Sequence, residues 1–285
     1  MIFKGICTAL VTPFTKSGEV DYVALKNLID FQVKAKVNAI LILGTTGESP
    51  SITDNEREKI IIFTKSLLPK SIKLIVGTGS NNFEKAKAQT LQAKYLGADG
   101  ALIVTPYYNK CTQNGVYMFY KKLSDASKFP IIVYNVPSRT GFNIMPNTMA
   151  KLAKLKYICG LKEANGNIDH IQEMFHVLQN FPIYSGNDNL NYLFFKLGAK
   201  GSISVASNAY PKLLAMHYKT KSLMLHKKLY EINKLLFVET NPIPIKYVLS
   251  KMGLVQNELR LPLTKLEEKN LLLLDKEIKN LEGEN

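Results

Sequence analysis

The chain has 285 residues, of which 46% are hydrophobic and 21% charged, and its mean hydropathy is −0.04. This composition is typical of globular proteins and excludes a disordered or membrane-embedded class, because no apolar stretch approaches the roughly 18 residues of a transmembrane helix. The net charge of +14 comes from lysines scattered among glutamates, with no long basic run, so it indicates a solvated surface and not a nucleic-acid site. Such a field would attract small anionic substrates.

Cysteine and histidine spacing argues against a metal site. The three cysteines are widely separated and form no CxxC pattern, and the four histidines match no HExxH-type spacing. We therefore expect neither a disulfide framework nor a bound metal. The first segment, "MIFKGICTALVTPF", has its lysine in the wrong place and too short an apolar run for a secretory signal, so we expect a cytoplasmic protein.

Short apolar runs alternate with longer segments of helical period along most of the chain. Runs this apolar indicate strands buried on both faces, as in a parallel sheet covered by helices. Eight such pairs in about 220 residues fit a closed (β/α)8 TIM barrel better than a doubly wound sheet. The predicted strands are 5–11, 38–43, 72–76, 100–104, 130–134, 158–162, 182–185 and 201–205.

Amphipathic periodicity predicts helices between these strands, for example at 21–36 and 83–96. The last part of the chain, 223–285, is also helical in period and contains "NPIPIKYVL". No linker rich in Ser, Gly or Pro precedes it. We therefore expect a catalytic barrel over 1–222 with a C-terminal helical extension packed on it.

The loops that follow the predicted strands are unusually rich in reactive residues. In a barrel of this kind the active site forms at the carboxyl ends of the strands, from the loops that follow them. Lys162 ends the sixth strand of the chain. The loops concerned are "GTTGES" (44–49), "GTGSN" (77–81), "TPYYN" (105–109), "YNVPSRTG" (134–141) and "SGND" (185–188).

Each loop alone has two readings. In "GTTGES", glycines and hydroxyls could present donors to a small carboxylate, or form a plain turn into a helix capped by Thr53 or Asp54. The paired tyrosines of "TPYYN" could pack or form an oligomer contact. Arg139 in "YNVPSRTG" could hold a carboxylate through two hydrogen bonds, or brace its loop.

Lys162 is either a strand-end charge reaching water or an amine that does chemistry. An unperturbed lysine, with a pKa near 10.4, carries almost no free amine at neutral pH, and burial at a barrel mouth would favour the neutral form. Tyr134 ends the preceding strand, about 5 Å away if the two strands are neighbours. A phenol there could deliver and remove the protons that imine formation requires. Thr45 and a tyrosine of the 107–108 pair could complete such a relay.

Taken together, the ordered motifs resemble the dihydrodipicolinate synthase family, class I aldolases that use pyruvate. The resemblance covers nearly the whole chain. The motifs that carry it are "GICTALVTPF", "GTTGES", "TPYYNK", "YNVPSRTG", "GLKEANGN", "SGND", "GSISVASN", "FVETNPIPIKYVL" and "LRLPL".

The resemblance implies a Schiff-base mechanism without a metal or organic cofactor. Lys162 would form the imine with pyruvate, and Tyr134 would donate and accept protons. Thr45 would connect Tyr134 to Tyr108, which a neighbouring subunit lends in this family. The site would then be complete only in a homo-oligomer, which the family suggests is a tetramer built from two dimers.

The same resemblance implies the substrate-binding residues. Thr45 and Thr46 would hold the pyruvate carboxylate, with Ile203 lining the same pocket and Gly186 near it. Arg139 would bind the carboxylate of the second substrate, L-aspartate 4-semialdehyde. The product would be 4-hydroxy-tetrahydrodipicolinate, in the first committed step of diaminopimelate and lysine biosynthesis.

Two alternatives stay open. N-acetylneuraminate lyases and keto-deoxy sugar acid aldolases of the same superfamily keep the lysine and the tyrosine but generally lack the arginine of "NVPSRTG", so Arg139 favours the semialdehyde. A barrel that has lost catalysis and only binds ligands is the other alternative.

The sequence departs from the family pattern at the regulatory site. In feedback-inhibited relatives, lysine binds beside an acidic residue four positions after the asparagine that is Asn81 here, and beside the tyrosine that is Tyr107 here. This chain has Lys85 at the acidic position and Arg57 where such relatives often carry histidine, which places like charges beside a lysine ligand. The neighbouring Glu84 could partly compensate. We predict weak or absent inhibition by lysine.

Overall fold

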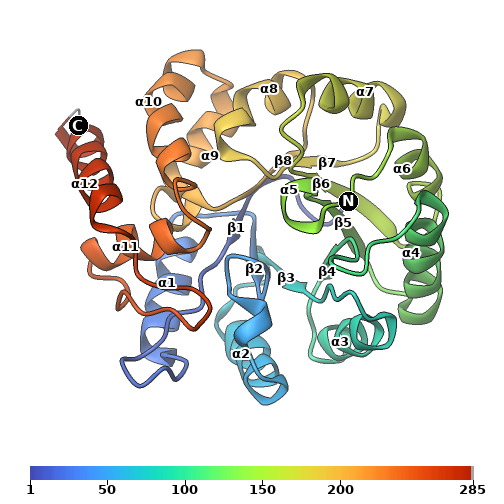
Figure 1. Cartoon of the computed structure of the whole chain (residues 1–285), viewed down its shortest axis with the longest axis horizontal. Helices are drawn as coiled ribbons and strands as arrows, with labels where there is room; N and C mark the ends of the chain where they lie inside the picture. Colours follow the sequence, from blue (N-terminus) through green and yellow to red (C-terminus); the bar gives the residue numbers. More distant parts are fainter. Residues whose placement is uncertain (284–285) are drawn as a thin grey trace.

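The computed structural model describes residues 1–283 and forms a closed barrel of eight parallel strands surrounded by helices (Figure 1). Each strand pairs with the next in chain order, and β1 closes the barrel against β8. The predicted (β/α)8 barrel with its C-terminal helices is confirmed, and most strand ends lie within one residue of the prediction. The strands are β1 (Gly5–Ala9), β2 (Ala39–Ile42), β3 (Lys73–Gly77), β4 (Gly100–Val104), β5 (Ile131–Asn135), β6 (Ile158–Glu163), β7 (Ile183–Ser185) and β8 (Gly201–Ser204).

The helices begin where polar side chains can cap them. Asp21 accepts hydrogen bonds from the first backbone amides of α1, and Thr53, one of the two predicted caps, forms a capping box with Glu56 at the start of α2. The helices around the barrel are α1 (Tyr22–Lys34), α2 (Asp54–Leu67), α3 (Phe83–Tyr95), α4 (Gln113–Ser127), α5 (Pro137–Thr140), α6 (Pro146–Leu152), α7 (Ile168–Leu178), α8 (Asn191–Lys196) and α9 (Pro211–Thr220), with 3-10 turns η1 (Ser49–Ser51), η2 (Asp188–Leu190) and η3 (Ala206–Asn208).

Two apolar clusters form the core. The larger lies between the strands and the surrounding helices, and the smaller fills the inside of the barrel. Inside, the ring of Tyr184 stacks on Phe3 with centroids 4.3 Å apart, and its hydroxyl donates to the Phe3 carbonyl. Because side chains alternate along a strand, β6 directs Leu161 into the outer cluster and Lys162 into the barrel.

The C-terminal helices pack on one side of the barrel (Figure 1). They are α10 (Leu223–Leu235), α11 (Ile243–Lys251) and α12 (Glu268–Gly283). Their buried side chains belong to the same outer cluster as those of the barrel helices. We propose the boundary between 1–222 and 223–285 as a topological one, since α10 begins at Leu223. The two parts share one continuous apolar core. Among residues 1–283, no helix combines the length and the apolar character needed to cross a bilayer.

Arg260 joins the C-terminal segment to the barrel. Its guanidinium donates to both carboxylate oxygens of Glu56 on α2 and to the carbonyls of Gly18 and Ser51. It also lies over the ring of Phe14, 4.4 Å from the centroid. The hydrogen bonds from Arg260 hold the pKa of the Glu56 carboxyl at about 2, well below its ordinary value.

This pair predicts a loss of stability in acid. Because the pKa of Glu56 is lower in the folded chain, its contribution is complete above about pH 4.5 and is lost as the pH falls towards 2. Glu56→Gln should lower the free energy of unfolding at pH 7 by about 1–2 kcal/mol, since solvent partly screens the pair. Glu58→Gln, an exposed change on the same helix, is the control. Urea unfolding between pH 7 and 2 tests this, and equal curves for both variants would contradict it.

Candidate active site

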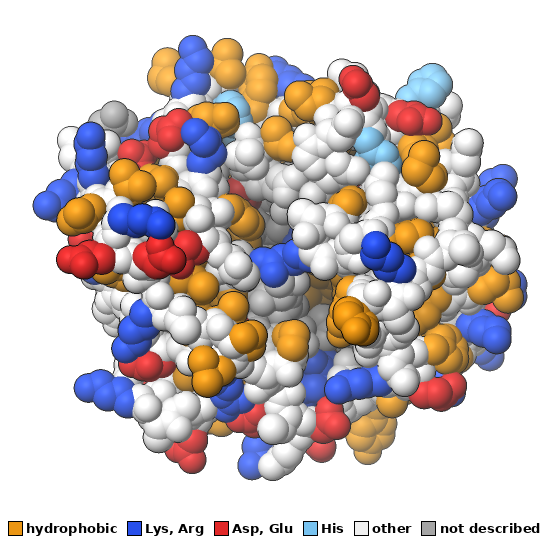
Figure 2. All heavy atoms as spheres, in the orientation of Figure 1, with side chains coloured by type: hydrophobic (Ala, Val, Ile, Leu, Met, Phe, Trp, Pro, Cys, Tyr) orange, Lys and Arg blue, Asp and Glu red, His pale blue; other side chains and the backbone are white. Residues whose placement is uncertain are grey.

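A cavity of about 740 Å³ opens at the carboxyl ends of the strands, and Figure 2 shows this face hollowed near its centre. The loops after β2, β5, β7 and β8 and the segment before α11 contribute to its walls. Six predicted site residues line it: Thr45, Thr46, Tyr134, Arg139, Lys162 and Gly186.

Lys162 and Tyr134 are placed side by side by the sheet itself. The two residues are direct partners in the register of β5 and β6. Both side chains are buried, with 5% and 7% exposed, and the Lys162 Nζ lies 4.2 Å from the centroid of the Tyr134 ring. A primary amine and a phenol in contact at the floor of a cavity can form an imine with a ketone and move its protons.

The carboxylate next to Lys162 in sequence is not its counter-ion. Glu163 points to the opposite side of the sheet, where it accepts two hydrogen bonds from the Asn135 amide and one from the backbone of Asn165. Among residues 1–283, no carboxylate lies within ion-pair distance of Lys162. The amine of Lys162 therefore lines the cavity without a carboxylate partner.

Gly186 keeps space for the lysine side chain. A Cβ atom at this position would lie 3.1 Å from Cε of Lys162 and 2.8 Å from Cβ of Ala164. Any larger residue would push against the lysine or against backbone that cannot move. The structure therefore gives Gly186 a steric role beside the amine.

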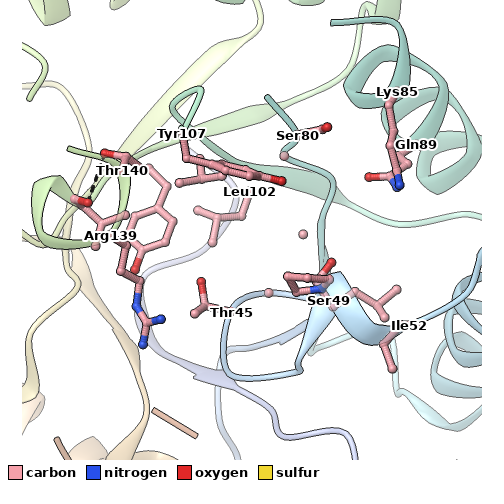
Figure 3. Close-up of a pocket in the computed structure, with 18 residues that line it drawn as sticks. Thr45, Ser49, Ile52, Ser80, Lys85, Gln89, Leu102, Tyr107, Arg139 and Thr140 are labelled. Atoms are coloured by element: carbon pink, nitrogen blue, oxygen red, sulfur yellow. Dashed lines mark hydrogen bonds between the residues drawn. The ribbon is translucent and has the colours of Figure 1, made fainter. Parts of the chain in front are cut away.

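The loop with Thr45 and Thr46 is tightly bent. Leu43 and Glu48, at its two ends, adopt left-handed backbone conformations with φ of 56° and 52°, which cost energy for residues other than glycine. Thr45 lines this cavity and also the smaller adjoining cavity that Figure 3 shows. Thr46 is buried, and its hydroxyl accepts a hydrogen bond of 3.0 Å from the side-chain amide of Asn241.

Arg139 lies on the short helix α5 and lines both this cavity and the smaller adjoining cavity drawn in Figure 3. One guanidinium nitrogen donates to the carbonyl of Asn241 at 3.1 Å. In residues 1–283, no carboxylate forms an ion pair with it. Arg139 thus has a structural contact, as one reading of the sequence expected, and can also bind an anion.

Two predicted site residues are not among the residues that line this cavity. Ile203 is buried in the inner cluster together with Tyr134, so it packs around the site. Tyr108 has a left-handed backbone and 91% of its surface exposed, and it does not reach Thr45 or Tyr134 within one chain. Its neighbour Tyr107 instead lines an adjoining cavity.

The sequence reading missed a buried ion pair behind the threonine loop. Lys246 on α11 pairs with Glu48, and both side chains are buried. The Lys246 ammonium also donates to the Glu258 carbonyl and lies 4.1 Å from the centroid of the Phe14 ring. Burial lowers the pKa of Lys246 to about 8, although the Glu48 carboxylate pulls it upward. The sequence does hint at this pair, because Glu48 and Lys246 are each the single charged residue in an otherwise uncharged segment.

The comparisons with known proteins agree with this architecture. The sequence profile of the Dihydrodipicolinate synthetase family matches residues 2–281. The 4-hydroxy-tetrahydrodipicolinate synthase of Thermotoga neapolitana is 47% identical over 285 residues, covering 96% of this chain and 97% of that protein.

Two solved structures resemble this chain in both fold and sequence. Dihydrodipicolinate synthase from Thermotoga maritima has a TM-score of 0.95 and 44% identity, covering 99% of both chains. A monomeric dihydrodipicolinate synthase variant also has a TM-score of 0.95 and 44% identity, covering 99% of this chain and 97% of that one. The chain therefore belongs to the dihydrodipicolinate synthetase family, and the resemblance in its motifs is confirmed.

The buried ion pair generates a stability prediction. Lys246→Met should lower the free energy of unfolding by roughly 3–5 kcal/mol, because it leaves the buried Glu48 carboxylate without its cation, held only by the backbone N–H of Arg260. The double variant Glu48→Gln with Lys246→Met should recover a large part of that loss. Urea denaturation of the three proteins measures this.

Lys251→Met is the matched control, because Lys251 lies on the same helix but is half exposed and pairs with Asp275 at the surface. It should change the free energy of unfolding by no more than about 1 kcal/mol. A Lys246→Met variant as stable as this control would show that the pair does not hold the loop.

Proposed function

We propose that this chain is a lyase that condenses pyruvate with L-aspartate 4-semialdehyde to give 4-hydroxy-tetrahydrodipicolinate, in diaminopimelate and lysine biosynthesis. The observation that carries the proposal is the buried Lys162 amine in contact with Tyr134 at the floor of the cavity. The relatives named 4-hydroxy-tetrahydrodipicolinate synthase, which match nearly the whole chain, support the choice of reaction.

In the first step, the Lys162 nitrogen attacks the ketone carbon of pyruvate. The carbonyl oxygen leaves as water after protonation, and the nitrogen is joined to carbon as an imine. Tyr134 supplies and removes the protons, since its side chain contacts the amine. Thr45 and Thr46 offer donors for the pyruvate carboxylate.

In the second step, the methyl group of the bound pyruvate loses a proton and its electrons move into the imine, which gives an enamine. The enamine carbon attacks the aldehyde carbon of the semialdehyde, and the aldehyde oxygen takes a proton to become a hydroxyl. The amino group of the semialdehyde then attacks the imine carbon and displaces the Lys162 amine. The ring closes and the enzyme is released, with no cofactor required.

Arg139 distinguishes this reaction from that of a sugar acid aldolase. Its guanidinium lines the cavity and suits the carboxylate of the semialdehyde. A sugar acid would instead need polar partners for several hydroxyl groups. We therefore keep cleavage of N-acetylneuraminate or a keto-deoxy sugar acid as the second candidate only.

We propose that a neighbouring subunit completes the site with Tyr108, in a homotetramer formed from two dimers. The exposure of Tyr108 in the single chain supports this assignment, because a large aromatic side chain that extends into solvent can be buried by a partner. We also place the enzyme in the cytoplasm, among soluble metabolites.

Replacing Arg139 tests the substrate assignment. Arg139→Ala should raise KM for the semialdehyde about a hundredfold, because a charge-assisted carboxylate contact is lost, and should change KM for pyruvate far less. Lys110→Ala removes an exposed nearby cation that does not line the cavity and serves as control. An assay coupled to reduction of the product measures both constants. Faster turnover of N-acetylneuraminate than of the two proposed substrates would overturn the assignment.

A further inference from the structure

Two histidines that do not line the active-site cavity stack where α8, α9 and α10 pack together (Figure 1). His217 on α9 lies against His226 on α10, with ring centroids 5.7 Å apart and planes 27° from parallel. His226 also stacks on Tyr192 of α8, at 5.4 Å. Phe195 meets His217 edge-on, and Tyr230 meets His226 in the same way. We call His217, His226 and Tyr192 the histidine stack.

The ring of His217 is buried without a hydrogen-bond partner. The residue is 0% exposed, and neither its Nδ1 nor its Nε2 atom has a partner among residues 1–283. The Nδ1 atom of the half-buried His226 has none either. Because a neutral imidazole keeps one N–H, at least one buried donor of His217 stays unsatisfied, which costs free energy. An apolar ring would fill the same space without this cost, so space filling alone does not explain a histidine here.

The elements around the stack leave a protonated histidine without a carboxylate partner. Neither histidine makes an ion pair within residues 1–283, and α8 and α9 contain no Asp or Glu. The one acidic residue of α10, Glu231, pairs with Lys234. The carboxylate of Asp188, in the turn η2 that packs on α10, accepts from two backbone amides. Glu277 of α12 lines a groove together with Lys227.

The other charged side chains of the three helices are cations. The Lys196 ammonium lies 5.4 Å from the centroid of the Tyr192 ring, on which His226 stacks. A proton on either histidine would therefore enter a positive field. The phenols of Tyr192, Tyr218 and Tyr230 supply no negative charge to oppose it. The remaining cations are Lys212 and Lys219 on α9 and Lys227, Lys228 and Lys234 on α10.

Both rings are harder to protonate in this packing than in water. Burial, and to a smaller extent the charge of a protonated His226, lowers the pKa of His217 from 6.5 to about 4. Burial also lowers the pKa of His226. Because an opened state would have the higher pKa, protons favour opening. The stability of the packing is therefore complete above about pH 6.5 and falls as the pH drops towards 4.

Helix α10 leads directly into the wall of the active-site cavity. The segment 237–241 that follows α10 lines the cavity. Asn233, near the end of α10, donates to the Asp188 carbonyl at 3.2 Å. The Asp188 carboxylate accepts in turn from the amides of Val205, which lines the cavity, and of Ala206. Any opening of α10 would therefore reach the cavity wall through two connections.

We infer that the histidine stack is a pH-sensitive joint, which holds α10 against α8 and α9 at neutral pH and releases it in mild acid. Protonation of one ring puts a charge into a stack that already borders the Lys196 ammonium, and protonation of both puts like charges on neighbouring rings. Separation of the helices relieves both, because water then reaches the imidazoles. The inference concerns helix packing and does not require the proposed reaction.

Hydrogen exchange read by peptide mass spectrometry at about pH 7.5 and about pH 5 tests the joint, with rates corrected for the intrinsic effect of pH on exchange. In the wild type, protection of peptides from α9, α10 and 237–241 should fall about tenfold or more at the lower pH, because the pKa of His217 is about 4 when packed and 6.5 when open. Peptides from β2 and β5 should keep their protection. His217→Phe, whose ring cannot be protonated, should remove most of the fall.

His176→Phe is the matched control, because His176 is exposed on α7 and lies outside the stack; it should respond to acid as the wild type does. His226→Phe replaces His217→Phe if the latter does not fold, with a smaller reduction of the fall. Three results would each overturn the inference: equal protection of α10 at both pH values in the wild type, an unchanged fall in His217→Phe, or an equal fall across the barrel strands. Turnover is assayed separately, and a protein that responds to acid but does not turn over would contradict only the proposed function.

Discussion

The register between β5 and β6 is the constraint on which the site depends. Parallel strands that pair directly, with side chains alternating in and out, force Tyr134 and Lys162 into contact inside the barrel. The same alternation turns Glu163 outward, where Asn135 satisfies it. A slip of one residue would exchange the amine for the carboxylate. Closure of the barrel by the remaining strands fixes this register. The fold itself therefore brings the phenol of Tyr134 and the amine of Lys162 together.

The C-terminal extension is part of this machinery. Asn241 donates to the Thr46 hydroxyl and accepts from Arg139, so it connects two segments that line the cavity, the loop after β2 and helix α5 after β5. Lys246 neutralises Glu48 at the end of the same threonine loop, which holds a left-handed residue in place. The barrel supplies the amine and the phenol of the proposed reaction, and the extension holds the loops around them.

The fold could be predicted because its signals are local. Apolar runs marked every strand, and the strand ends located Lys162 and Tyr134. The contacts made by Asn241 and Lys246 could not be predicted, because their partners lie 195 and 198 positions away in the chain. The segment that contains both residues was predicted only to be helical. The burial of Ile203 in the inner cluster could not be read from its motif either, because a motif gives a residue's neighbours in sequence but not whether its side chain lines a cavity or packs in the core.

The proposed reaction requires the Lys162 amine to react covalently with a small oxo acid. The most direct test is borohydride reduction of the protein in the presence of pyruvate, followed by peptide mass spectrometry. We expect a reduced pyruvate adduct on the peptide that contains Lys162, and none in the Lys162→Met variant. An unmodified Lys162 under saturating pyruvate, or an adduct on another lysine alone, would contradict it.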